Sequence, residues 1–260
     1  MTQAISAFKL GIVIPLKARA VSADWERVCA NLANTLASIT QQSNVAYQCV
    51  VVGHDDPHLP VHFLATDIDV PQVAELQGQA LRLAYEKDRS LKVILGLDYL
   101  AKTDCSHFFA LDADDLLHQD FVQHLSQFDL PQSFIIKHGY MHYVDKQMVN
   151  PTQEFDVYCG SCAVISKATL NACLAKQHYF YDHIAHCDFQ HYFEQQQVPY
   201  TIPSQSLMMY VRDNGENISA LDNERTHLSK LWYRCKREVL IYIRAVGQYK
   251  LIMTEFGIKG

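Results

Sequence analysis

The sequence has little positive charge and no long apolar run. Its 260 residues carry 22 lysines and arginines against 28 aspartates and glutamates, a formal net charge of −6. General nucleic-acid binders need a dominant basic surface, so we expect no nucleic-acid partner. No stretch reaches the roughly eighteen apolar residues of a membrane helix, and residues 1–9 lack the charge and apolar core of a signal peptide. These absences predict a soluble, cytoplasmic protein.

Glycine-rich nucleotide loops and paired cysteines are also scarce. The 10 glycines form neither the GxGxxG loop of dinucleotide-binding proteins nor the phosphate loop of ATPases, which excludes both classes. The 8 cysteines are scattered, and a chain of this length has core enough to fold without disulfides, so we expect reduced thiols. Cys159 and Cys162 form one close pair, which is weak evidence for zinc without a second pair.

Apolar β-branched runs alternate with helical patterns in the first half of the chain, which is typical of an α/β sheet flanked by helices. The patterns predict strands at 10–16, 47–53, 61–68 and 107–111, and helices at 25–39, 91–99 and 116–128. Beyond residue 130 they predict shorter strands at 134–137, 139–144 and 157–166, and helices at 181–196 and from 228 onward. We therefore expect one domain over 1–227 and a helical extension over 228–260.

Three acidic residues follow the apolar run that ends at Leu111. Asp112 and Asp114 are two positions apart, so strand geometry can present their carboxylates on the same side. Adjacent carboxylates repel each other unless a cation lies between them. The pair predicts a site for a divalent metal that carries a phosphate group. Asp115 is expected to start the following helix, with a ligand role as the alternative.

Polar residues also follow the other predicted strands. Lys17 comes after the first strand, and Asp55 comes after the second. Ligands of open α/β sheets bind at the carboxyl ends of strands, and cations suit a diphosphate. Arg89 and Lys92 precede Gly96, whose missing side chain is expected to allow close packing of a helix on the sheet.

Taken in order, these segments resemble the GT-A glycosyltransferases of family 2. The resemblance is carried by Ile14-Pro15, Gly53-His54-Asp55-Asp56, Lys92 with Gly96-Leu97, the motif Asp112-Ala113-Asp114-Asp115, and Cys159-Gly160-Ser161. It implies a GT-A fold, a Rossmann-like mixed sheet flanked by helices. Residues 1–128 would form the nucleotide-sugar-binding half and residues 129–227 the acceptor half.

The resemblance implies a metal-dependent transfer of a sugar from a nucleoside diphosphate sugar, most often a UDP-sugar, to a hydroxyl group. It assigns Asp114 to Mn²⁺ or Mg²⁺ and Asp112 to the metal or the ribose. The implied nucleotide-sugar contacts come from Pro15, Asp55, Lys92, Asp112, Ala113 and Arg212. The acceptor is expected to be a glycan or a lipid-linked molecule of polysaccharide biosynthesis.

A transfer that inverts the sugar's configuration needs a base to remove the proton of the acceptor hydroxyl. The family usually supplies an aspartate from a Glu-Asp pair at the start of a helix, and that pair is absent here. Asp188 and His186 fall near its place. Asp188 has the family's chemical type, and the imidazole of His186 suits proton transfer near neutral pH.

Two other functions stay open. The missing Glu-Asp pair fits a nucleotide-sugar-binding protein of the same fold without catalysis. Aspartate-based phosphatases also carry Asp-x-Asp at a strand end. Their motif lies on the first strand and continues to threonine or valine, whereas here Leu116 follows Asp115 on a later strand.

The predicted helix from Leu228 combines an apolar stripe with basic residues. Such a helix can rest on an anionic membrane, which would suit a lipid-linked acceptor. Packing against the catalytic domain explains the same stripe, so peripheral membrane contact is one of two interpretations.

Overall fold

A computed structural model describes residues 7–128, 132–175, 188–212, 247 and 249–258. The apolar run that opens the sequence forms β1 (Leu10–Pro15), which is buried along its whole length. β1 pairs in parallel with both β2 (Tyr47–Gly53) and β4 (His107–Ala110). Continuous apolar runs are typical of parallel strands that are covered on both faces. The residues that follow these three strands therefore meet at one edge of the sheet.

The large sheet has the strand order β10-β6-β9-β4-β1-β2-β3 in the described part of the chain. β3 (His62–Ala65) continues the parallel arrangement next to β2. β9 (Ala163–Ser166) runs antiparallel to β4 and to β6 (Ser133–Ile135), and β10 (Tyr200–Thr201) pairs in parallel with β6. The sheet is therefore mixed, and the predicted mixed α/β class is confirmed.

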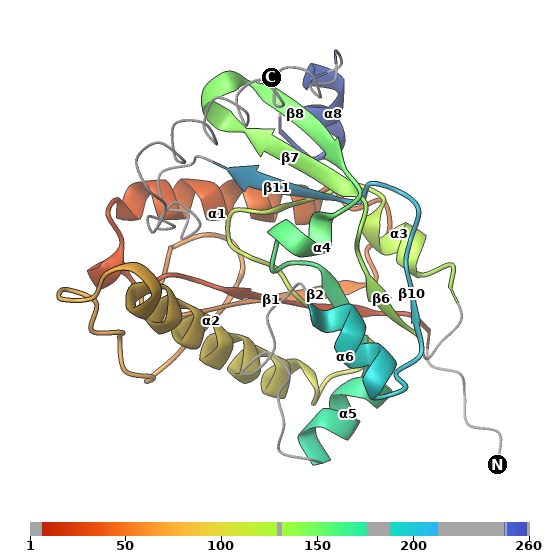
Figure 1. Cartoon of the computed structure of the whole chain (residues 1–260), viewed down its shortest axis with the longest axis horizontal. Helices are drawn as coiled ribbons and strands as arrows, with labels where there is room; N and C mark the ends of the chain where they lie inside the picture. Colours follow the sequence, from red (N-terminus) through yellow and green to blue (C-terminus); the bar gives the residue numbers. More distant parts are fainter. Residues whose placement is uncertain (1–6, 129–131, 176–187, 213–246, 248, 259–260) are drawn as a thin grey trace.

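Helices α1 (Trp25–Thr40) and α2 (Gly78–Leu100) lie on either side of β1 in Figure 1. α1 begins after Asp24, whose side chain accepts a hydrogen bond of 3.1 Å from the backbone N–H of Arg27. Such a cap satisfies one of the free N–H groups at a helix start. The short segments η1 (Arg19–Val21) and α3 (Phe121–Leu125) connect the larger elements.

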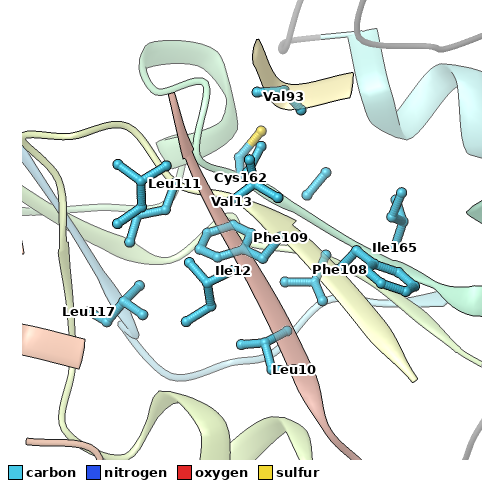
Figure 2. Packing of buried hydrophobic residues seen from close by; sticks show 14 of the residues in the cluster. Leu10, Ile12, Val13, Val93, Phe108, Phe109, Leu111, Leu117, Cys162 and Ile165 are labelled. Carbon is cyan, nitrogen blue, oxygen red and sulfur yellow. The ribbon is translucent and has the colours of Figure 1, made fainter. Parts of the chain in front are cut away.

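The core lies between the large sheet and these helices. Figure 2 shows Ile12 and Val13 of β1 beside Phe108, Phe109 and further buried side chains from β9 and α2. The two phenylalanines are fully buried. This dense apolar layer holds the strand ends in fixed relative positions.

Gly96 brings α2 close to the sheet, as its position in the sequence predicted. A Cβ added at Gly96 would lie 2.9 Å from one methyl group of Val13 and nearer still to the other. We expect Gly96→Ala to lower the free energy of unfolding by about 1–3 kcal/mol, because the buried, branched side chain of Val13 has little room to move. Urea denaturation measures this loss. Gly247→Ala is the control, since an added Cβ there would meet nothing within 4 Å in the described structure. Equal effects of the two substitutions would contradict the packing argument.

A second, smaller sheet has the order β5-β11-β7-β8. Its strands are β5 (Leu116–Leu117), β7 (Gly139–Tyr143), β8 (Met148–Thr152) and β11 (Met208–Arg212), with η2 (Val144–Lys146) between β7 and β8. Helix α8 (Tyr249–Glu255) lies beside this sheet in Figure 1. Its Ile252 and Met253 belong to one buried apolar cluster with Leu116, Val149, Met209 and Val211 of the sheet. In the described segments, no helix has both the length and the apolar character to cross a membrane.

Two predicted elements after residue 115 differ from the structure in type over part of their length. The predicted helix at 116–128 is instead the strand β5 followed by the short helix α3, because Leu116 and Leu117 pair antiparallel with Met209 and Met208 of β11. The predicted strand at 157–166 begins only at Ala163. The helix α4 (Phe155–Tyr158) and residues 159–162, which belong to neither a helix nor a strand, precede it.

Two further helices differ from the prediction in extent. α2 begins at Gly78 rather than at residue 91. Of the helix predicted at 181–196, the structure describes α6 (Phe189–Gln195), preceded in the chain by α5 (Lys167–Ala175). Residues 176–187 and most of the predicted helix from Leu228 lie outside the described residues.

Candidate functional site

A pocket opens where β1 and β4 end, beside α2. Its cavity volume is about 200 Å³, and the pocket is open to solvent. Five residues expected at a nucleotide-sugar or metal site line it together: Pro15, Lys92, Asp112, Ala113 and Asp114. Lys17 and Arg89 add positive charge to the same walls, and Tyr210 comes from the second sheet.

Asp112 is held by an arginine of α2. The Nε of Arg89 donates to Oδ1 of Asp112 over 2.5 Å, and both side chains are partly exposed to the pocket. Oδ2 of Asp112 lies beside Gly160, 3.3 Å from where a Cβ on that glycine would be. The same Cβ would lie 3.1 Å from Nη2 of Arg89. A glycine at position 160 therefore leaves room for the ion pair.

Asp115 does not join its neighbours in the pocket. Its side chain is fully buried, and its Oδ2 accepts hydrogen bonds from Oγ of Ser161 at 2.7 Å and Sγ of Cys159 at 3.0 Å. Burial, and then the charges of Asp114 and Asp112, raise the pKa of this carboxyl well above its ordinary value. The predicted helix start at Asp115 is wrong, because Asp115 closes a turn onto the carbonyl of Asp112 and β5 follows.

Ser161 ties the acidic motif to the segment before β9. Its Oγ accepts a 2.9 Å hydrogen bond from the backbone N–H of Asp112 and donates to Asp115. The structure places Ser161 and Cys159 in contact with the buried end of the motif. Sequence reasoning missed this clamp, because residues more than forty positions apart form it.

Lys92 supports the pocket from within the core. It is fully buried, and its Nζ donates to the carbonyl of Leu16 at 2.8 Å and to Oδ2 of Asp88 at 2.6 Å. Burial lowers the pKa of Lys92, while the hydrogen bond from the ammonium to Asp88 acts in the opposite direction. Asp88 was missed in the sequence, although its spacing of four residues from Lys92 on a helix is a signal for such a pair.

The remaining predicted residues lie apart from the lining. Asp55 follows β2, and its Oδ2 accepts a 2.8 Å hydrogen bond from the backbone N–H of Arg19. Arg212 ends β11, with its guanidinium 5.8 Å from the ring centre of Tyr210 and 6.0 Å from that of Tyr143. Both residues are outside the set that lines the pocket.

The two candidate bases are not brought to the pocket by the described structure. Asp188 is exposed and immediately precedes α6, and it is not among the lining residues. His186 lies outside the described residues.

The carboxylates fit a metal that arrives with a phosphate ligand. Asp112 and Asp114 offer oxygen ligands at the pocket wall. The described residues contain no group of three histidines, cysteines, aspartates or glutamates that could hold a metal ion by itself. Mg²⁺ typically binds through one or two carboxylates together with waters and substrate phosphates. The donor set thus suits a shared metal and diphosphate site.

Comparison with known proteins found no matching family model and no matching curated protein. Among solved structures, Staphylococcus aureus TarS 1-349 in complex with UDP is 12% identical, with a TM-score of 0.47, over 78% of this chain and 60% of that chain. A second structure of TarS 1-349 is 13% identical, with a TM-score of 0.44 and the same coverage of both chains. A further TarS structure is 12% identical, with a TM-score of 0.46, over 78% of this chain and 37% of that chain. The chain thus spans less than two thirds of these structures.

Proposed function

We propose that the chain is a metal-dependent glycosyltransferase that moves a sugar from a nucleoside diphosphate sugar, a UDP-sugar, to a hydroxyl group of a glycan or lipid-linked acceptor. One observation carries the proposal: a single pocket contains the carboxylates of Asp112 and Asp114 and the cations of Lys17 and Arg89. A diphosphate with a divalent metal is the ligand that needs both kinds of group. The sequence resemblance supplies the reaction class.

Asp112 and Asp114 would hold the metal in this proposal. When bound, Mn²⁺ or Mg²⁺ neutralises the charge that develops on the leaving diphosphate. Arg89 fixes the Asp112 carboxylate before the ligand arrives, since the ion pair spans 2.5 Å. Ser161 fixes the backbone of the same residue. A carboxylate held from two sides loses little freedom on binding, which favours affinity.

The cations of the pocket stabilise the donor's phosphates. Lys17 follows β1 and Arg89 lies on α2, so they reach the pocket from different elements. Hydrogen bonds from ionised donors to phosphate oxygens are stronger than neutral ones. Lys17 and Arg89 therefore favour the diphosphate as a leaving group.

The proposed transfer inverts the configuration of the sugar. Asp188 takes the proton of the acceptor hydroxyl, with His186 as the second candidate. A non-catalytic nucleotide-sugar-binding protein is the alternative, favoured by the absence of Asp188 from the pocket lining. Mn²⁺-dependent hydrolysis of the sugar nucleotide separates the two, because a pure binding protein shows none.

A thermal-shift screen tests the proposal. UDP, GDP, CDP and ADP are each added with Mn²⁺ and with EDTA, and the melting temperature is recorded. We expect a rise in melting temperature with a nucleoside diphosphate and Mn²⁺ together, because a ligand that binds the folded state stabilises it. UDP-sugars are then tested for release of UDP. The absence of any shift with every nucleotide would refute the proposed donor site.

A further inference from the structure

Residues 249–258, which we call the C-terminal strap, lie against the strand that follows the acidic motif. Phe256 is fully buried, and together with Ile252 of α8 it joins the apolar cluster that contains Leu116 of β5. Leu116 comes two positions after Asp114 in the chain. The contacts of the strap therefore begin just downstream of a residue that is proposed to bind the metal.

Backbone contacts fasten the strap to the same segment and to α1. The N–H of Gln119 donates to the carbonyl of Glu255 at 2.8 Å. Gly257 has a φ of +81°, and a Cβ added there would lie 3.1 Å from Cα of Ser38 on α1. The hydroxyl of this serine in turn accepts a 3.1 Å hydrogen bond from the N–H of Leu117 in β5. The strap thus holds the segment after the motif both directly and through α1.

The strap also covers one face of β11. Met209 and Val211 belong to the same apolar cluster as the strap, and they flank Tyr210, which lines the pocket. Successive side chains of a strand point to opposite faces. The strap therefore packs on the face of β11 that is turned away from the pocket. It supports the lining at two places, next to Asp114 and behind Tyr210.

We propose that the C-terminal strap positions the metal site: its packing on β5 and β11 fixes the acidic motif in the geometry that metal binding requires. The start of the motif is fixed by Ser161, which bonds to the N–H of Asp112. Its end continues into β5, which has two residues and pairs with two residues of β11. A binding site must hold its ligating groups to within about 0.5 Å. So short a strand needs the strap behind it to reach that precision.

The inference rests on the proposed function, because it takes Asp114 to be a metal ligand. It also predicts an effect in the opposite direction. If the docked strap raises the affinity for the ligand by some factor, the bound ligand must stabilise the docked strap by the same factor. A helix of the length of α8 is not stable alone in water. Detachment therefore also breaks the hydrogen bonds within the strap, among them those donated by the N–H groups of Phe256 and Ile258.

Titration calorimetry with UDP and Mn²⁺ tests the inference. We expect Ile252→Ala to lower the affinity at least about fivefold while circular dichroism shows a folded chain, because a coupling between two sites is typically of this size or larger. Leu251→Ala is the matched control, since Leu251 is the neighbouring residue of α8 and is 56% exposed. It should leave the affinity unchanged.

A second control separates positioning from a general loss of stability. Leu170 is buried on α5. The first N–H of α5 bonds to the carbonyl of Ser106, just before β4, so this helix begins at the opposite end of β4 from the pocket. Leu170→Ala should destabilise the chain and leave the affinity for UDP and Mn²⁺ unchanged.

Hydrogen exchange provides the reciprocal measurement. UDP with Mn²⁺ should slow the exchange of the Phe256 and Ile258 amides at least about fivefold in the unmodified chain. Exchange in the strap that is faster than in β1 and unaffected by the ligand would overturn the inference.

An unchanged affinity in Ile252→Ala, or an equal loss in Leu170→Ala, would also overturn the inference and leave the proposed function intact. Failure of the unmodified chain to bind UDP with Mn²⁺ would instead count against the proposed donor site. If Ile252→Ala does not fold, Ile252→Val makes a smaller change in the same contact and carries the same test.

Discussion

Asp114→Asn is expected to lower the rate of sugar transfer by at least about 100-fold, because it removes one of two charges that would hold the metal against the diphosphate. Asparagine keeps the size of the side chain, so the pocket keeps its shape. Asp114 lines the pocket and is only half-buried. The measurement is the initial rate of UDP release at saturating acceptor and Mn²⁺. The stabilisation by UDP and Mn²⁺ in a thermal-shift assay should be lost at the same time.

Asp104→Asn provides a matched control for this experiment. Asp104 lies just before the opposite end of β4, with a side chain that is 75% exposed and paired with Lys9. Its replacement should leave both the rate and the response to Mn²⁺ unchanged. An Asp114→Asn variant that keeps the Mn²⁺ response of the unmodified chain would show that the metal assignment is wrong. A chain whose activity persists in EDTA would show the same.

Lys92→Met is expected to lower the free energy of unfolding by about 3–5 kcal/mol, the range found when one partner of a buried ion pair is removed. The methionine fills nearly the same volume. The carboxylate of Asp88 then stays buried without its cation, and the carbonyl of Leu16 loses a donor. Urea denaturation followed by circular dichroism measures the loss.

Two variants show whether this loss comes from the ion pair. Lys87→Met replaces an exposed lysine of the same helix and should change stability by less than about 0.5 kcal/mol. The double variant Asp88→Asn/Lys92→Met should recover part of the stability, because no unpaired charge remains. A double variant that is less stable than the sum of the two single losses would contradict the assigned pairing.

The first part of the fold was predictable because its signals are local. β1 is a buried apolar run, β2 is buried from Val50 to Gly53, and the predicted bounds of β2 match the structure. α2 was predicted too short, because charged residues among positions 82–89 interrupt the apolar periodicity. β5 was predicted as helix, because its strand character comes from pairing with β11, more than ninety residues later. Local pattern carries no information about such a partner.

The candidate site was also predictable only where its signals are local in the sequence. Asp112 and Asp114 stand out because their charges follow a buried strand, and the structure brings them together at the pocket. Asp115 has the same charge and was misread, since its burial depends on Ser161 and Cys159 from a distant segment. The buried ion pair of Asp88 and Lys92 was not predicted, for a similar reason. Their spacing is visible in the sequence, but the enclosure of both side chains is a tertiary property.

The pairing of β5 with β11 also bears on how the chain becomes folded during synthesis. The strand that follows the acidic motif finds its partner only once Met208 and Met209 have been made. The carbonyl of Glu255 then accepts from the N–H of Gln119, and Gly257, with a φ of +81°, lies against Ser38 of α1. Residues 1–128 therefore lack these contacts until Met208, Met209, Glu255 and Gly257 have been made. A nascent segment over residues 1–128 would expose the apolar side chains of β5 and need protection from aggregation.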